Sequence, residues 1–250
     1  MVIFSLFCRK IKNQMKKIIF AFATTLLLMS CSEKKSDANT VITGNVKGLS
    51  NGTLYLQRMN DSSYVAIDSV KIDGDSNFKF NLNLESPELL YLVLDRGITS
   101  SIDNKLPFFA EIGKINIDTD LKYFFSNAKI TGSKNHELYE EFEKVNTNYK
   151  SQILEISKEK FDALRFNRLK DVDSIDQKIN KRMLRKFLYI INFAMNNKDY
   201  EVSPYVALSE LTLTNSPYLD TIQKNMPPKI AASKYGKILT EYVQNKNSKN

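Results

Sequence analysis

The chain has 250 residues with 36 basic and 28 acidic side chains, which gives a formal net charge of +8. Five of the basic residues lie within the first 17 positions, where no acidic residue occurs. Without them the remainder carries 31 basic and 28 acidic side chains, a net charge of +3. Such a mixed surface lacks the basic excess that phosphate backbones require, so the composition argues against nucleic-acid binding.

Residues 1–30 are expected to be a signal peptide. The basic pair Lys16-Lys17 precedes an apolar run over residues 18–29, which is too short to span a bilayer. Ser30 then supplies a small residue at the cleavage position, directly before Cys31. A cysteine as the first residue after the cut is typical of a bacterial lipoprotein, because its thiol is acylated and becomes the new N-terminus. Residues 1–14 are interpreted as upstream of a true start at Met15, the alternative being an unusually long basic region.

Cys31 is therefore the expected lipidation site and the link to the membrane. Residues 31–39 are polar and are predicted to form a short tether. They contain no acidic run of the kind that sends some lipoproteins to the cell surface. We expect a Gram-negative envelope protein that faces the periplasm, on the outer rather than the inner membrane. With Cys8 removed and Cys31 acylated, no thiol remains for a disulfide, for redox exchange or for zinc.

Residues 40–132 are predicted to form a β-rich domain. Short runs rich in β-branched and aromatic residues recur at roughly ten-residue spacing, separated by turn residues, and this pattern is typical of an antiparallel β-sandwich or open barrel. The predicted strands are residues 41–46, 53–56, 64–72, 78–82, 89–94, 107–112, 114–117 and 128–130.

Residues 133–245 are predicted to be helical, and residues 246–250 form a polar tail. Apolar residues recur every three or four positions from Leu138 to Ile156, and again from Ile175 to Ala194. The first stretch is rich in acidic residues and the second in basic residues, so the two helices could pair antiparallel. The alternative is that each set of charges only solvates its own helix. The predicted fold class is α+β: a β-sandwich or open barrel followed by a helical region with an antiparallel helix pair.

The sequence offers few residues that could act as a nucleophile, a base or a metal ligand. We therefore expect no enzymatic activity, no cofactor and no metal. His136 is the only histidine, and its place at the start of a charged helix predicts a surface or capping role. Asp68 and Asp95 are the carboxylates in strand contexts, where hydrogen bonds at a strand edge or turn account for them. No glycine-rich phosphate loop is present.

An aromatic-rich segment lies between the two predicted halves and is a candidate partner or ligand surface. The alternative is that its rings fill the core at the interface between the halves. The residues are Phe108, Phe109, Tyr123, Phe124 and Phe125.

Several short motifs resemble, in their order, a β-rich domain of unknown function. That domain precedes the thioredoxin-like domain of many TlpA-like or peroxiredoxin-like envelope thiol–disulfide oxidoreductases, and the resemblance covers residues 40–245. The motifs are Val41-Ile42-Thr43-Gly44-Asn45-Val46, Gly52-Thr53-Leu54-Tyr55-Leu56, Ile67-Asp68-Ser69-Val70, Asp73-Gly74, Phe78-Lys79-Phe80, Ile130-Thr131-Gly132-Ser133 and Ser233-Lys234-Tyr235-Gly236.

The resemblance implies an accessory role without the family's redox chemistry. The chain has no tryptophan and no cysteine after Cys31, so no position corresponds to a Trp-Cys-x-x-Cys active site. The leading hypothesis is a non-enzymatic, lipid-anchored module that binds a protein partner or forms a homodimer, through a helical face or an edge strand such as residues 64–72. One alternative is the N-terminal half of a split or truncated oxidoreductase, whose thioredoxin-like protein would be encoded separately. The other is a lipoprotein that binds a small ligand between its two halves.

Overall fold

The computed structural model describes residues 37–60, 63–97, 102–212 and 218–248. Cys31, Ser30, the signal peptide and most of the tether lie outside the described residues. Residues 38–250 form one compact unit, which holds every element described below. Among the described helices, none combines the length and apolar character needed to cross a bilayer.

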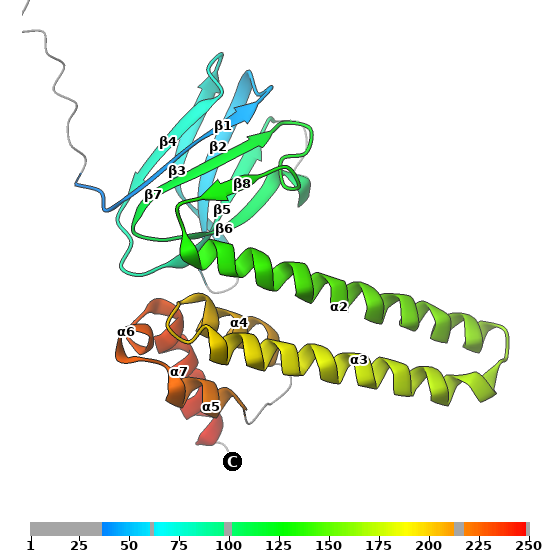
Figure 1. The fold of residues 1–250 in the computed structure, drawn as a ribbon. Helices are drawn as coiled ribbons and strands as arrows, with labels where there is room; N and C mark the ends of the chain where they lie inside the picture. Colours follow the sequence, from blue (N-terminus) through cyan, green and yellow to red (C-terminus); the bar gives the residue numbers. More distant parts are fainter. Residues whose placement is uncertain (1–36, 61–62, 98–101, 213–217, 249–250) are drawn as a thin grey trace, which may run out of the picture. The chain divides into compact units, whose positions relative to one another are not determined.

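The first half of the unit is a sandwich of two four-stranded sheets (Figure 1). One sheet has the strand order β4-β1-β7-β8 and the other β3-β2-β5-β6. A short 3-10 helix, η1 (Ile102–Asn104), precedes β6. The strands are β1 (Thr40–Lys47), β2 (Asn51–Asn60), β3 (Ser63–Asp73), β4 (Asn77–Leu82), β5 (Glu88–Asp95), β6 (Lys105–Ala110), β7 (Gly113–Asp120) and β8 (Lys129–Thr131).

Alternation of apolar and polar residues builds the sandwich core. In the first sheet Ile42 lies opposite Phe80 on one side and Ile115 on the other, and all three are buried. In the second sheet Leu92 lies opposite Leu56 and Leu106 in the same way, and all three belong to the same core cluster. Side chains of a strand alternate between its two faces, so each sheet presents one apolar face to the other.

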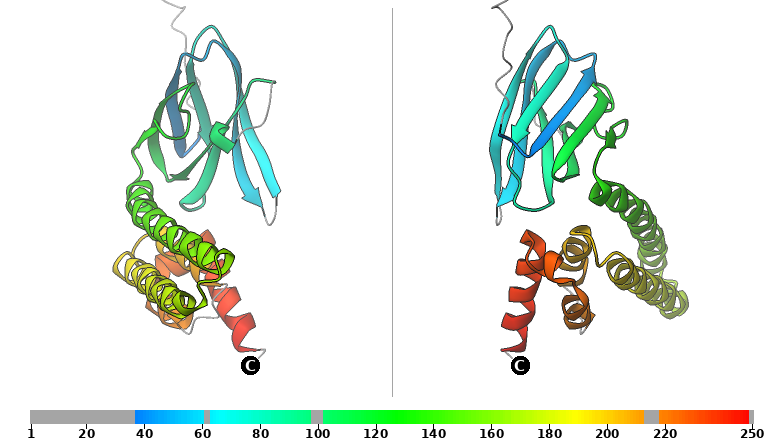
Figure 2. Two further views of the ribbon diagram at one scale, coloured as in Figure 1. Left: turned by 90° about the vertical axis from the view of Figure 1, so that its right-hand side faces the viewer. Right: turned by 60° about the vertical axis from the view of Figure 1, so that its left-hand side comes forward.

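The second half is helical. α2 (Lys134–Arg165) and α3 (Leu169–Asn196) form an antiparallel hairpin, whose helices run side by side in Figures 1 and 2. Four shorter helices follow: α4 (Val202–Leu211), α5 (Tyr218–Asn225), α6 (Pro228–Ala231) and α7 (Lys234–Asn247). α4 and α5 pack against the hairpin, α7 packs against α4 and α5, and α6 packs against α7. The predicted α+β fold class, a β-sandwich followed by helices with an antiparallel pair, is confirmed.

Two details differ from the expectation. β1 and β7 pair in parallel, with Thr40 opposite Gly113, so the sandwich is not wholly antiparallel. Asn39, expected at the end of the tether, is bound to the sandwich: its side-chain amide donates to the carbonyl of Leu84 at 2.8 Å and accepts from the Leu84 N–H at 2.9 Å. The Asn39 amide thus makes the two hydrogen bonds to Leu84 that the backbone of a neighbouring strand would make. It links the start of β1 to the segment before β5.

A second apolar core joins the sandwich to the helices. It contains Leu89 of β5 and Phe109 of β6, together with Leu138 and Phe142 of α2 and buried residues of α3 to α7. These two strand residues occupy the alternate positions that point away from the sandwich core. The outer face of the second sheet is therefore covered by helices at this end, which places α7 against the start of β5.

Candidate functional site

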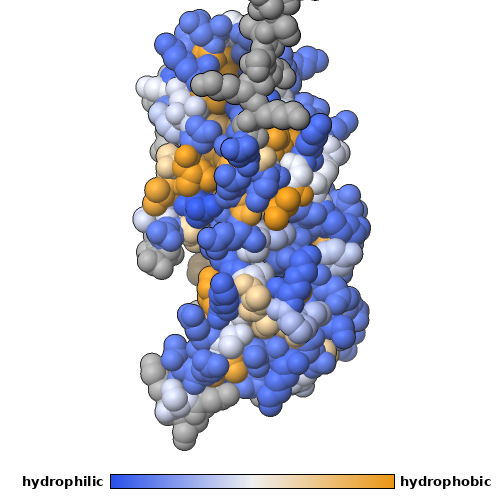
Figure 3. Space-filling model, turned by 90° about the vertical axis from the view of Figure 1, so that its left-hand side faces the viewer, coloured by the Kyte–Doolittle hydropathy of each residue, from blue (hydrophilic) through white to orange (hydrophobic). Residues whose placement is uncertain are grey.

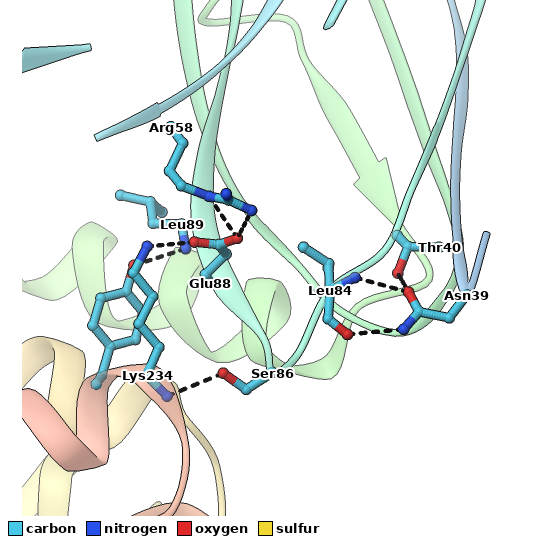
Figure 4. Close-up of polar contacts among 9 residues, drawn as sticks. Asn39, Thr40, Arg58, Leu84, Ser86, Glu88, Leu89 and Lys234 are labelled. Atoms are coloured by element: carbon cyan, nitrogen blue, oxygen red, sulfur yellow. Dashed lines mark hydrogen bonds and ion pairs between the residues drawn. The ribbon is translucent and has the colours of Figure 1, made fainter. Parts of the chain in front are cut away.

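The first turn of α7 is hydrogen-bonded to the start of β5 (Figure 4). The backbone N–H of Leu89 donates to the Tyr235 hydroxyl at 2.9 Å, and the backbone N–H of Lys234 donates to Oγ of Ser86 at 3.1 Å. Leu89 directly precedes Leu90, which is the first β5 residue paired with β2. The tyrosine hydroxyl thus satisfies a buried strand N–H that would otherwise have no acceptor.

Glu88 is a buried acid held between two cations at this junction. Only 4% of the residue is exposed. Its Oε1 accepts from Nε of Arg58 at 2.9 Å and from Nη2 at 2.5 Å, and its Oε2 pairs with the Lys234 ammonium. A buried carboxylate is tolerated when it is paired and hydrogen-bonded in this way. The ion pairs join β2, β5 and α7.

The sequence around Lys234 fixes where α7 begins. Ser233 is its N-cap, and the Ser233 Oγ accepts from the N–H of Gly236 at 3.3 Å. A Cβ atom at Gly236 would lie 1.9 Å from the carbonyl oxygen of Ile230, so only glycine fits against α6. Each of the residues 233–236 therefore has a separate role at the junction. Ser233 caps α7 and Lys234 forms the ion pair with Glu88. Tyr235 accepts the Leu89 N–H, and Gly236 permits the close approach to α6.

Two further carboxylates converge on Asn135 at the start of α2. The Asn135 Nδ2 donates to Oε2 of Glu111 at 3.2 Å and to Oε2 of Glu201 at 3.0 Å. Glu201 is only 3% exposed. Among the described residues neither glutamate is in an ion pair. Glu111 accepts from the Asn135 amide, the Asn135 N–H and the Ser133 hydroxyl, and Glu201 accepts from the Asn135 amide. Both carboxylates are therefore hydrogen-bonded at this place without a paired cation.

Both charge clusters line one cleft of about 990 Å³ between the sandwich and the helices. Its walls come from β2, the β4–β5 loop, the β6–β7 turn, the start of α4, and α6 and α7. Figure 3 shows that the surface on this side of the unit is largely hydrophilic over the junction and the helices. Four cations and four carboxylates line the cleft: Arg58, Lys229, Lys234, Lys237, Glu85, Glu88, Glu111 and Glu201.

His136, in the first turn of α2, is buried, which corrects the expected surface role. Its side chain is 3% exposed, although its backbone N–H does take part in the cap by donating to Ser133 Oγ. Nδ1 accepts from the Phe109 N–H at 3.4 Å, and Nε2 lies 3.3 Å from Oε1 of Glu140. Burial lowers the pKa of His136 below 6.5, against the opposing effect of Glu140. The expectation was wrong because the first turn of α2 is covered by the sheet.

The candidate aromatic segment is divided by the structure. Phe108 and Phe124 are buried in the sandwich core, while Tyr123 and Phe125 are 50% and 53% exposed. Phe109 is buried at the junction. These five rings do not form one surface, and none of them lines the cleft.

Phe109 is the centre of a tyrosine cluster. Its ring contacts Tyr139 at 5.6 Å, Tyr205 at 5.2 Å and Tyr235 at 6.0 Å between centroids, in edge-to-face geometry. Burial raises the pKa of all three tyrosine hydroxyls above the usual 10. These hydroxyls stay neutral at physiological pH and serve as hydrogen-bonding groups of the junction core.

The remaining candidate carboxylates bind nearby backbone: Asp68 lies within β3 beside a register shift, and Asp95 is the last residue of β5. Asp68 accepts from the N–H of Ser69 at 2.7 Å, and Asp95 accepts from the N–H of Gly97 at 2.7 Å. Within the described ranges, no group of three or more His, Cys, Asp or Glu side chains is arranged to hold a metal ion.

Comparison with known families gives one match. Residues 40–139 match the model of a domain of unknown function, DUF4369. No curated protein matches the chain. No solved structure matches it either. The matched segment holds the sandwich and the first turn of α2, including Glu88, Glu111 and Asn135, but it ends before Glu201 and Lys234. The cleft is therefore formed jointly by the matched domain and by helices outside the match.

Sequence reasoning missed the charged residues of the cleft. The motif Ser233-Lys234-Tyr235-Gly236 belongs to the family resemblance, where it corresponds to the final helix, but its sequence indicates no role for Lys234 or Tyr235 at a site. A usable signal existed at Glu88, where an acid follows Pro87 and directly precedes six mostly apolar residues at the start of a buried strand. An acid in that position needs a cationic partner. Its two partners, Arg58 and Lys234, lie 30 and 146 positions away and could not be identified from the pattern.

Proposed function

We propose that this chain is a lipid-anchored envelope protein that acts by binding, and that the junction cleft holds a small zwitterionic ligand such as a short peptide. The cleft carries the proposal, because it places paired carboxylates and several cations around one volume of about 990 Å³. Pockets of a few hundred to about a thousand Å³ with a few placed polar groups are the usual form of small-ligand sites.

The first part of the proposal is a lipid anchor, which we assign to a single residue. Cys31 follows an apolar run and a small residue, as a lipidated cysteine does. Two or more acyl chains hold a protein stably on a membrane, since each buried methylene contributes about 0.8 kcal/mol. We place the protein at the envelope, facing the periplasm, on the outer rather than the inner membrane.

The charges of the cleft define the ligand class. Glu111 and Glu201 share a single amide and have no paired cation among the described residues, so they are suited to accept an ammonium group. Lys229 and Lys237 are exposed on α6 and α7, and Arg58 and Lys234 together outweigh Glu88. This side would attract a carboxylate. A molecule with both an amine and a carboxylate matches both sides.

Thermal unfolding of the full chain with three matched peptides tests the proposal. Triglycine has both charges, N-acetyltriglycine lacks the amine and triglycine amide lacks the carboxylate. A ligand at 100 times its Kd stabilises the folded state by about 2.7 kcal/mol, which is a clear shift in melting temperature. We expect a shift with triglycine at millimolar concentration and a smaller shift, or none, with either blocked peptide.

Variants locate the binding. Glu201→Gln keeps the hydrogen bond to Asn135 but removes the charge, and Lys237→Ala removes an exposed cation of the cleft; each is expected to weaken triglycine binding. Glu155→Gln and Lys224→Ala change matched charges outside the cleft and are the controls. No stabilisation by triglycine, or equal stabilisation of the Glu201→Gln variant, would contradict the proposal.

A further inference from the structure

Two large apolar side chains line the junction cleft and lie outside both apolar cores. Ile112, in the turn between β6 and β7, is 54% exposed, and Ile238 of α7 is 42% exposed. Both line the cleft, and neither belongs to the sandwich core or to the core that joins the sandwich to the helices. Such half-exposed isoleucines give the cleft apolar surface that a bound molecule can remove from water.

Ile112 is held in place by hydrogen bonds of the residues on either side of it. The Glu111 carboxylate accepts from the backbone N–H and the side-chain amide of Asn135 at 3.0 and 3.2 Å. The N–H of Gly113 donates to the carbonyl of Asn39 at 3.0 Å. Ile112 therefore follows directly after one of the two carboxylates proposed to accept the ligand's ammonium group, on a turn whose two flanks are fixed.

Ile238 lies on the cleft side of α7 together with the cations of that helix. Lys234, Lys237 and Ile238 are spaced by three and four positions, so they share one face of the helix, and all three line the cleft. A different stripe of α7, which includes Leu239 and Val243, packs into the junction core. Ile238 therefore lies beside the cations on the side of the cleft proposed to bind the ligand's carboxylate.

We propose that Ile112 and Ile238 select peptides with apolar side chains at both ends: the N-terminal side chain contacts Ile112, and the C-terminal side chain contacts Ile238. This inference rests on the proposed function, because it takes a zwitterionic peptide as the occupant of the cleft. On each side of the cleft a charged group and an isoleucine are neighbours, as a charged terminus and a side chain are in the end residue of a peptide. Apolar contact adds affinity in proportion to the apolar area removed from water.

Leucine peptides test the selection against triglycine. Leu-Gly-Gly and Gly-Gly-Leu each add one apolar side chain to triglycine, whereas Asn-Gly-Gly and Gly-Gly-Asn add a polar side chain of nearly the same shape. Isothermal titration calorimetry of the full chain gives the dissociation constant of each peptide. We expect each leucine peptide to bind about tenfold more tightly than triglycine. Each asparagine peptide is expected to bind no more tightly than triglycine.

Variants assign each contact to its isoleucine. Ile112→Ser is expected to remove the tighter binding of Leu-Gly-Gly and to keep that of Gly-Gly-Leu, and Ile238→Ser to do the reverse. Leu154→Ser changes a side chain of α2 that is 57% exposed and lies outside the cleft, so it is the matched control. This control is expected to keep the tighter binding of both leucine peptides. The melting temperature of each variant without peptide verifies that it is folded.

The outcomes separate this inference from the proposed function. Leucine peptides that bind no more tightly than triglycine, or no more tightly than the asparagine peptides, would overturn the selection while the zwitterionic site stands. Tighter binding of a leucine peptide that persists after its own isoleucine is replaced would overturn the assignment to Ile112 and Ile238. Absence of binding for every peptide would contradict the proposed function and this inference together.

Discussion

The hydroxyl of Tyr235 in α7 accepts the backbone N–H of Leu89 in β5, 146 positions earlier in the chain, at 2.9 Å. Side chains of Glu88 and Lys234, the residues directly before these two, form an ion pair in the same place. A helix beyond the matched domain thereby completes the hydrogen bonding of a strand within it. The geometry of the cleft depends on this contact, since both α7 and β5 line it.

Replacing Tyr235 by Phe is expected to destabilise the chain by about 1–3 kcal/mol, because the Leu89 N–H is left buried without an acceptor. Urea unfolding followed by circular dichroism measures this. Tyr123→Phe removes a half-exposed hydroxyl and serves as the control, with an expected change below about 0.5 kcal/mol. Equal stability of the two variants would show that the hydrogen bond is absent in solution.

Gly236→Ala is expected to be strongly destabilising although the change adds only one methyl group. The new Cβ would lie 1.9 Å from the Ile230 carbonyl oxygen, so α7 must move away from α6. Overpacking of this kind costs about 1–3 kcal/mol. The measurement is the melting temperature, with Lys237→Ala on the exposed side of the same turn for comparison. A Gly236→Ala chain as stable as the wild type would refute the close approach.

The hydrogen bonds of Glu210 in α4 are expected to make the free energy of unfolding depend on pH. Its carboxylate accepts from Lys186 of α3 at 2.9 Å and from Asn146 and Lys150 of α2 at 2.9 and 3.0 Å. Burial acts to raise the pKa of Glu210, but these hydrogen bonds outweigh it and lower the pKa below 4.5. A lowered folded pKa contributes stability that is full above 4.5 and lost as the pH falls through the folded value.

The Glu210→Gln variant therefore isolates this contribution. We expect it to be less stable than the wild type by about 1–3 kcal/mol at about pH 7, and the difference to shrink as the pH falls below 4.5. Unfolding curves recorded between about pH 3 and pH 7 provide the test. A difference that is constant over the whole range would contradict the lowered pKa.

Cys31→Ala is expected to leave an unprocessed precursor or to release the chain into soluble fractions. Fractionation of cells and the intact mass of the mature protein measure both outcomes. Normal processing with unchanged membrane association of the Cys31→Ala variant would contradict lipidation at this position.

Local sequence patterns predicted which residues form strands and helices. They did not predict how the strands pair or which helix faces the sheet covers. The alternation in β1 places Ile42 in the core whichever way its neighbour runs, so the pattern carries no information on the parallel pairing with β7. The burial of His136 was missed for a related reason. A helical pattern identifies the apolar stripe of α2, but the sheet that covers its first turn comes from a distant part of the chain. Both failures concern contacts between elements.

The cleft illustrates the same limit at the level of the site. Its charged residues come from β2, the β4–β5 loop, β5, the β6–β7 turn, the N-cap of α4, α6 and α7, and each by itself resembles an ordinary surface charge. Only the fold brings Glu111 and Glu201 to one amide. The aromatic segment was chosen because its rings are close in sequence, yet alternation along β6 sends Phe108 and Phe109 to opposite cores.

A crystal structure of the full chain with bound triglycine tests the central claim most directly. We expect the peptide in the cleft between β5 and α7, with its amine about 3 Å from a carboxylate oxygen of Glu111 or Glu201. Its carboxylate is expected on the side of Lys229 and Lys237. An empty cleft at saturating peptide, or a peptide bound elsewhere on the chain, would contradict the account.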